Sequence, residues 1–361
     1  MARGRREGRR GRRVLIVALG LLLLLGAGAV GGYLWLLREF RAPGPGTAAT
    51  LLEVEPGASL RSIFARLEAS GAVRHAQAVA MYLRLSGQRP RMQAGTYEIP
   101  AHASPEDIIA LFEQGKVVLE QLTVVEGATF RDFLDELDRH PRVEHTLRSQ
   151  SPAQIMAALG HAGVSPEGEF FPDTYRFAAN TPDVAILALA YDSMQRALAT
   201  AWAQRSPRLP YDTPYQALIL ASMVEKEAAL KSERAQIAGV FVNRLRKRMR
   251  LQSDPTVIYG LGEQYDGSIH TRDLLRDTPY NTYTRAGLPP TPVALPGRES
   301  LLAAVRPEAT EALYFVATGL GDGAHHFSSR LAEHNAAVKA YLTRLRAQER
   351  TAERKPASSR P

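Results

Sequence analysis

The sequence lacks cysteine altogether, although it has 361 residues. Disulfide bonds and thiolate metal sites are therefore excluded. The lack of cysteine does not decide in which cellular compartment the protein lies. Histidines do gather in AHHFSSRLAEHN, but the spacing of His325, His326 and His334 matches no standard zinc pattern. We expect these histidines to be structural or to line a substrate site, and we expect no metal and no other cofactor. Loss of activity with a chelator would contradict this expectation.

Charge is also absent from residues 14–37, VLIVALGLLLLLGAGAVGGYLWLL. A helix of this length spans roughly 36 Å, which exceeds a bilayer core of about 30 Å. Residues 1–13 hold seven arginines and one glutamate, and arginines mark the cytoplasmic flank of a membrane span. We therefore predict a cytoplasmic tail at 1–13, a single transmembrane helix at 14–37 in the cell inner membrane, and a body outside the cytoplasm.

Two alternatives to a membrane anchor stay open. Ala27-Gly28-Ala29 resembles the cleavage site of a signal peptide, although the apolar stretch continues past it. A buried core helix is the second alternative. The formal net charge of +8 suits an anionic partner, but membrane topology accounts for the N-terminal arginines. We therefore expect no nucleic acid partner.

Composition divides the rest of the chain. Residues 38–50 are rich in Pro and Gly and indicate a linker, whereas residues 346–361 are polar and indicate a disordered tail. Three segments between them share a β-like lead-in, a turn, a hydroxyl residue and an amphipathic helix: VEPGASLRSIFARL, IPAHASPEDIIALF and VVEGATFRDFLDEL. Because a hydroxyl can accept from the free N–H groups at a helix start, we predict N-caps at Ser59, Ser104 and Thr129. The irregular spacing leaves open that the likeness is accidental.

After residue 150 the pattern becomes more helical. Helices are predicted at 182–198, from Thr213-Pro214 onward and at 232–249, with a strand at 313–318 and a last helix at 331–345. Residues 252–296 are dense in Pro, Gly, Asn and Tyr and indicate loops. The sequence has no alternating βαβ series, so the predicted fold class is α+β.

The helix that begins at Pro214 ends in the charged run EKE, residues 225–227. Its apolar side chains surround it almost completely at about 100° per residue, which predicts a central, buried helix. Both carboxylates would be partly buried, and periodicity does not choose between them. Burial raises the pKa of a carboxyl group, as a general acid near neutral pH requires. The alternative is a structural ion pair of either glutamate with Arg234, Arg244 or Lys226.

Several segments occur in a fixed order: QAGTY, FFPDTYRF, ASMVEKEA, LQSDPTVIYG, YNTY with GLPPTPVALPG, LYFVA, and HHF with EHN. In this order they resemble the membrane-anchored endolytic murein transglycosylases, the YceG-like family, over residues 51–345. The resemblance implies a small LysM-like α/β subdomain at 51–120 and a helix-rich α+β catalytic domain at 121–345. It implies that the substrate is peptidoglycan glycan, cut within the strand, and it suggests peptidoglycan synthases as partners.

The resemblance assigns the catalytic role to Glu225, the first glutamate of the run, and not to Glu227. It also implies substrate contacts, at Ser222, Gln252, Asp254, Asn281 and Tyr283. Ordinary glycosidases use two carboxylates. Muramic acid, however, carries a C6 hydroxyl that can attack C1 and close a 1,6-anhydro ring, so one carboxyl group can make both proton transfers. Cleavage of the MurNAc-GlcNAc bond would then leave 1,6-anhydroMurNAc ends and would terminate strand elongation near the membrane.

Two other functions fit the same sequence. A glycoside hydrolase on this substrate would need a second essential carboxylate, Asp254 or Glu227, and would release reducing ends. A membrane-tethered peptidoglycan-binding scaffold would bind glycan without turnover, and its binding would survive the substitution Glu225→Gln.

Overall fold

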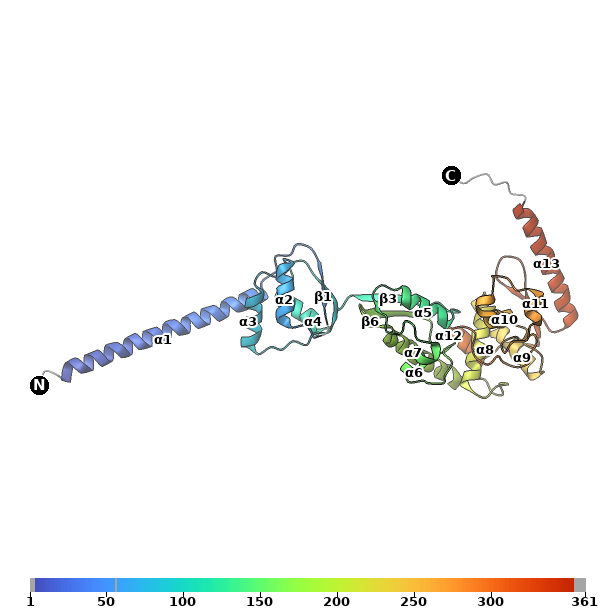
Figure 1. Ribbon diagram of the computed structural model, residues 1–361, viewed down its shortest axis with the longest axis horizontal. Coiled ribbons are helices and arrows are strands. Elements are labelled where there is room, and N and C mark those ends of the chain that lie inside the picture. Colours follow the sequence, from blue (N-terminus) through green and yellow to red (C-terminus); the bar gives the residue numbers. More distant parts are fainter. Residues whose placement is uncertain (1–3, 56, 354–361) are drawn as a thin grey trace. The chain divides into compact units, whose positions relative to one another are not determined.

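A computed structural model describes residues 4–55 and 57–353 of the chain. The structure is mixed α+β with a helix-rich body, as the sequence predicts, and Figure 1 shows its elements along the chain. The chain divides into two compact units. The first unit is Met1–Glu120 with Ala178–Asn180, and the second unit is Gln121–Phe177 with Thr181–Pro361.

The first unit begins with the long helix α1 (Gly4–Arg41). Among the described residues, this helix supplies the one segment, Leu15–Arg41, that is long and apolar enough to cross a membrane. The side chains of residues 21–25 are all exposed, so no part of the chain that the structure describes covers them. The helix extends beyond 14–37 at both ends, and it therefore includes residues 4–13 of the expected tail and the start of the expected linker. Residues 1–3 of that tail lie outside the described part.

A small α/β body follows α1 in the same unit. β1 (Thr50–Val54) and β2 (Gly95–Ile99) pair antiparallel, with Leu52 opposite Tyr97. Three helices complete the body: α2 (Leu60–Ala69), α3 (Ala76–Ser86) and α4 (Pro105–Glu113). The core contains Phe40 of α1 together with Phe64, Tyr97 and Phe112. The last turns of α1 are therefore part of the folded body.

The three predicted N-caps are confirmed. Ser59, Ser104 and Thr129 each accept a hydrogen bond of 3.1 Å from the backbone N–H three residues later. At Ser104 and Thr129 an aspartate, Asp107 or Asp132, accepts in turn from the N–H of the cap residue and completes a capping box. The third helix, α5 (Phe130–Arg139), belongs to the second unit. The shared pattern is therefore a local helix-start signal that occurs in both units.

The second unit begins within β3 (Leu119–Thr123), which pairs with β5 (Thr174–Ala178). β4 (Val143–Glu144) and β6 (Thr181–Pro182) form a short parallel pair. β3, β4 and β5 share one core with α5, α6 (Pro152–Ala158) and the first half of α7 (Asp183–Ala203). Phe133, Phe170 and Leu187 lie fully buried in that core.

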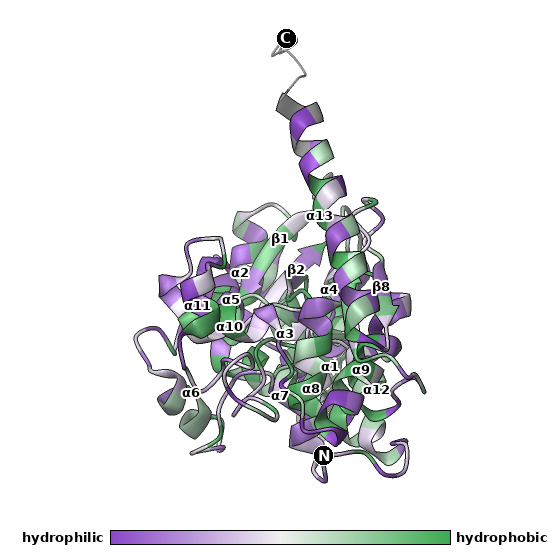
Figure 2. Cartoon of the chain, turned by 90° about the vertical axis from the view of Figure 1, so that its right-hand side faces the viewer, coloured by the Kyte–Doolittle hydropathy of each residue, from purple (hydrophilic) through white to green (hydrophobic). Residues whose placement is uncertain are grey.

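The central helix of the second unit is α8 (Pro214–Glu227). Thr213 caps it by accepting from the N–H of Gln216, and Pro214 takes the first helical position, as predicted. All residues from 217 to 224 are buried, which confirms a central helix, and Figure 2 shows its hydrophobic colouring. Its neighbours are α7, α9 (Arg234–Arg246) and α12 (Arg298–Val305). The short helix η1 (Lys231–Glu233) lies between α8 and α9.

The structure places short helices in the region predicted as loops. Within residues 252–296 these are α10 (Asp254–Leu261), η2 (Gly262–Gln264) and α11 (Thr271–Leu275). None is longer than the 8 residues of α10, so an amphipathic period cannot stand out from the surrounding Pro, Gly and Asn. β7 (Tyr314–Ala317) confirms the predicted strand, and β8 (His325–Ser328) pairs with it antiparallel.

The last helix, α13 (Leu331–Glu353), packs on β7 and β8. It continues beyond residue 345, so the start of the tail that we expected to be disordered is helical. Residues 354–361 of that tail lie outside the described part. The turns of α13 that leave the hairpin alternate between hydrophilic and hydrophobic residues in Figure 2.

Candidate active site

The two glutamates at the end of α8 have different surroundings. The side chain of Glu225 is only 4% exposed, and its Oε1 accepts a 2.5 Å hydrogen bond from the Arg234 guanidinium. Its Oε2 accepts from the backbone N–H of Gly297 at 2.9 Å, where α12 begins. Arg234 is 7% exposed and also pairs with Glu126 and Glu299. Both oxygens of Glu225 are therefore engaged in a contact that joins α8 to α9 and α12.

Glu227 projects from α8 about 160° away from Glu225, because successive helical residues differ by about 100°. Its Oε1 accepts a 2.6 Å hydrogen bond from the Ser253 hydroxyl. Burial raises the pKa of the Glu227 carboxyl from 4.5 to about 7. The Ser253 hydrogen bond and the positive charge of Arg244 oppose this rise in the pKa, whereas the negative charge of Asp254 adds to it. Near neutral pH this carboxyl can therefore both donate and accept a proton.

The Glu227 carboxyl borders a half-open cleft of about 390 Å³ in the second unit. The walls come from the end of α8, from α9, from the loop that leads into α10, from the β7–β8 hairpin and from α13. The lining residues are Glu227, Arg244, Leu251, Gln252, Asp254, Tyr283, Phe315, Val316, Ala317, His325, His334 and Val338. Glu225 is not among them.

Three of the predicted substrate contacts lie in this cleft. Asp254 starts α10 and accepts a 2.6 Å hydrogen bond from the hydroxyl of Tyr283. Burial, together with the nearby carboxylate of Asp254, raises the pKa of Tyr283, so its hydroxyl stays protonated and acts as a donor. Gln252 has an exposed side chain and a backbone φ of 50°, in the left-handed region. Its N–H donates to the Thr282 carbonyl at 3.1 Å, which fixes this unusual turn at the rim of the cleft.

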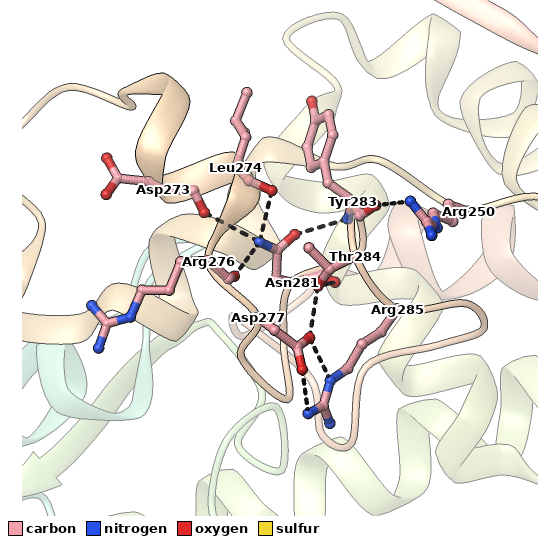
Figure 3. Close-up of polar contacts among 9 residues, drawn as sticks. All are labelled: Arg250, Asp273, Leu274, Arg276, Asp277, Asn281, Tyr283, Thr284 and Arg285. Atoms are coloured by element: carbon pink, nitrogen blue, oxygen red, sulfur yellow. Dashed lines mark hydrogen bonds and ion pairs between the residues drawn. The ribbon is translucent and has the colours of Figure 1, made fainter.

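The side chains of the other two predicted contacts, Asn281 and Ser222, lie outside this cleft. Figure 3 shows that the Asn281 amide nitrogen donates to three backbone carbonyls, those of Asp273, Leu274 and Arg276, at 3.2, 3.1 and 2.6 Å. Its Oδ1 accepts from the N–H of Tyr283 at 2.8 Å. Ser222 is fully buried, donates to the Ile219 carbonyl and accepts from the Val293 N–H. These side chains hold the loops in place and do not line the cleft.

Arg244, which the sequence offered as an ion-pair partner, lines the cleft. It is buried, and its Nε and Nη1 donate to the carbonyls of Leu313 at 2.6 Å and Leu251 at 2.8 Å. Its guanidinium also lies 5.3 Å above the Tyr314 ring. Arg244 therefore joins the β7 side of the cleft to the loop before α10. It places a fixed positive charge near Glu227.

The predicted histidine cluster lies partly in the cleft. His325 lines the cleft, and its ring Nδ1 lies 2.7 Å from Oε2 of Glu233. The other carboxylate oxygen of Glu233, Oε1, accepts a hydrogen bond from the His325 backbone N–H. His334 stacks on Tyr314 at 5.1 Å. Burial and the charge of Arg244 lower the pKa of His334, so its ring is neutral at neutral pH. His325 and His334 line the cleft, whereas His326 does not. Within residues 4–55 and 57–353 no group of three or more His, Asp or Glu is placed to hold a metal ion.

A family model described as the YceG-like family matches residues 52–340, which include every residue of the cleft. The chain belongs to the YceG-like family. A YceG-like crystal structure from Listeria monocytogenes has 28% sequence identity and a TM-score of 0.52, and the match covers 80% of this chain and 99% of that one.

Two curated relatives of this YceG-like chain are named endolytic murein transglycosylase. The relative from Bacillus subtilis (strain 168) is 30% identical over 311 residues, which cover 81% of this chain and 84% of that protein. The relative from Streptococcus pneumoniae serotype 2 is 27% identical over 362 residues, which cover 91% of this chain and 65% of that protein. Both similarities extend over most of the YceG-like chain.

Proposed function

We propose that this YceG-like protein is an endolytic murein transglycosylase and that Glu227, and not Glu225, is its catalytic acid and base. The observation that carries the proposal is the Glu227 carboxyl, which is buried, borders the cleft and has its pKa raised to about 7. Glu225 has both oxygens bound to protein groups. The resemblance placed the role on the first glutamate of the run, and the contacts favour the second.

In the proposed reaction, protonated Glu227 gives its proton to the glycosidic oxygen while the bond from that oxygen to C1 of muramic acid breaks. The resulting carboxylate then takes the proton of the C6 hydroxyl as O6 bonds to C1. The strand ends in a 1,6-anhydro ring, the other fragment carries a free hydroxyl, and Glu227 is protonated again. No water is consumed, so a second catalytic carboxylate is unnecessary, in contrast to hydrolysis.

Other cleft residues would bind and position the sugar. The Tyr283 hydroxyl is held by Asp254, and we propose that this pair, together with Gln252, contacts the glycan. Arg244 supplies a positive charge near Glu227 and therefore favours the carboxylate form that the second proton transfer requires. The ring of His325, which lines the cleft with its side chain 12% exposed, gives a planar group against which a pyranose ring can pack.

The membrane assignments are part of the same proposal. The apolar segment of α1 would hold the protein in the cell inner membrane, with residues 1–13 in the cytoplasm and the chain from residue 38 onward outside. Residues 51–120 of the first unit would form a LysM-like module, and the catalytic domain would occupy 121–345. Cleavage would then be confined to new glycan near the membrane, where it would terminate strand elongation beside peptidoglycan synthases.

The decisive experiment is product mass analysis with the full-length protein in detergent and uncrosslinked glycan strands. Internal fragments one water lighter than hydrolysis products, lost with Glu227→Gln and retained with Glu225→Gln, would establish the reaction and its acid and base. Because Glu225→Gln breaks a buried ion pair, each variant is first checked for folding by thermal unfolding.

A hydrolase is the second candidate, because Asp254 gives the cleft another carboxylate. Fragments with reducing ends, and complete loss of turnover with Asp254→Asn, would support hydrolysis. Under our proposal Asp254→Asn weakens substrate binding and leaves the anhydro products unchanged in mass. Glycan binding without any product from the parent protein would point to a scaffold.

A further inference from the structure

An exposed face of α3 carries two large apolar side chains. Met81 is 50% exposed and Leu85 is 59% exposed, and they lie one helical turn apart. The opposite face, with Val79, Tyr82 and Leu83, is buried in the core of the first unit. The exposed face therefore has no protein partner within the described residues.

The contacts between α3 and α1 show which turns of the membrane helix α3 packs against. A bilayer core of about 30 Å takes roughly 20 helical residues, so a core that begins at residue 14 ends near Tyr33. The Tyr82 ring lies 6.0 Å from that of Tyr33 and stacks on Phe40 at 4.5 Å. At the other end of α3, His75 lies 5.9 Å from Trp35. The helix α3 therefore packs against the turns of α1 that leave the hydrocarbon core.

The orientation of α3 follows from its neighbours in the first unit. α2 packs on the buried side of α3, and in Figure 1 α3 lies on the side of the small body nearest the long free part of α1. The exposed face of α3 is turned away from α2, on the side of the helix that the core of the first unit does not cover.

The charge around this face is of one sign. Residues 74–91 contain four arginines and no aspartate or glutamate. Arg84, Arg89 and Arg91 are exposed, and none of them forms an ion pair within the described part of the chain. Apolar side chains surrounded by arginine are typical of helices that lie in a membrane interface and contact anionic lipids.

We propose that α3 is an interfacial helix of the bilayer that α1 spans. Met81 and Leu85 insert at the boundary between head groups and acyl chains, and Arg84, Arg89 and Arg91 contact lipid phosphates. This inference rests on the proposed membrane anchor. It deepens that proposal, because the small α/β body then lies against the membrane surface. Both α1 and α3 would fix its distance from the bilayer.

The absence of cysteine allows a direct test. Single substitutions Met81→Cys and Leu85→Cys in the full chain are labelled with an environment-sensitive fluorophore and reconstituted into vesicles of phosphatidylethanolamine and phosphatidylglycerol. Quenching by lipids brominated near the head group reports the depth of each label. The matched control is Leu51→Cys, since Leu51 is a leucine of the same unit that is 66% exposed on β1. Leu25→Cys reports the anchor itself.

We expect quenching at positions 81 and 85 at least about twofold stronger than at 51, since an interfacial helix buries its apolar face about 5–10 Å below the head groups. Replacing Arg84, Arg89 and Arg91 by Gln in the labelled Leu85→Cys protein should reduce its quenching. Strong quenching at 25 with equal, weak quenching at 81, 85 and 51 would overturn the interfacial helix and leave the anchor standing. Weak quenching at 25 as well would overturn the anchor, and this inference with it.

Discussion

Substituting the two glutamates of α8 one at a time should change stability in opposite directions. Glu227→Gln replaces a buried carboxyl whose ionisation is unfavourable in the folded state. Glu225→Gln instead removes the negative charge that forms an ion pair with Arg234. We therefore expect Glu227→Gln to be inactive and more stable at alkaline pH, and Glu225→Gln to be less stable and still able to make anhydro products. Neither change alters the length of the side chain, so the pair is well matched.

The magnitude for Glu227 follows from its pKa. The folded pKa of about 7 lies above the unfolded value of 4.5, so the folded state binds the proton more tightly and stability falls as pH rises between these values. At about 1.4 kcal/mol per pKa unit, ionisation costs the folded state about 3 kcal/mol above pH 7 and nothing below pH 4. Glu227→Gln should recover up to that amount at pH 8. Glu167 has its pKa raised to about 7 as well, but it is present in both proteins and cancels in the comparison.

The magnitude for Glu225 follows from its contacts. Breaking an isolated buried ion pair costs about 3–5 kcal/mol. Arg234, however, keeps Glu126 and Glu299 as partners. We therefore expect Glu225→Gln to lower the free energy of unfolding by about 1.5–3 kcal/mol, as for a hydrogen bond to a charged group.

Thermal unfolding of the two full-length variants and the parent at pH 4 and pH 8 tests both expected changes in the free energy of unfolding. A domain of this size shifts its Tm by about 2–4 °C per kcal/mol. Glu227→Gln should raise the Tm by up to about 10 °C at pH 8 and leave it unchanged at pH 4. A Tm gain at pH 8 with Glu225→Gln, or a loss there with Glu227→Gln, would refute the assignment of the two carboxylates.

Four further predictions concern the same site. The kcat/KM of the parent should fall about tenfold per pH unit above pH 7, as Glu227 loses the proton that it donates, and a pH–rate profile measures this. Asn281→Ala should lower the free energy of unfolding by about 3 kcal/mol, because three backbone carbonyls lose their donor; a raised KM at unchanged Tm would contradict this role. Arg244→Met should reduce kcat roughly 10²-fold in single-turnover assays, and an unchanged kcat would remove its charge from the mechanism. Ser222→Ala should lower the free energy of unfolding by about 1 kcal/mol and leave kcat/KM unchanged. A lowered kcat/KM at unchanged Tm would show that Ser222 contacts substrate.

Local signals predicted much of the fold. The caps at Ser59, Ser104, Thr129 and Thr213 are set by side chains that bond to an N–H three residues away, so short sequence windows contain the information. The burial of α8 was likewise visible, because apolar residues on all sides of one helix leave no face for solvent. The β8 strand and the short helices α10, α11 and α12 were missed, since segments of this length show no clear period.

The choice between the glutamates could not be made in the same way. Helical periodicity fixes the angle of a side chain about the helix axis, but it does not say what lies in that direction. The partners of Glu225 are Arg234, nine residues away in sequence, and Gly297, 72 residues away. The cleft beside Glu227 includes His325 and His334 from the C-terminal part of the chain. Only the fold brings these groups to α8.

The two glutamates are nevertheless coupled, and this affects how any activity measurement is interpreted. Glu225 fixes the last turn of α8 to α9 and α12, and Glu227 leaves that same turn toward the cleft. A substitution at Glu225 can therefore lower activity by moving Glu227 away from Ser253, with no chemical role of its own. Such a loss should recover when the fold is stabilised by lower temperature, because the acid itself is intact. A loss caused by Glu227→Gln cannot recover, because the proton donor is absent. The temperature dependence of the residual activity therefore separates the positioning residue from the catalytic one.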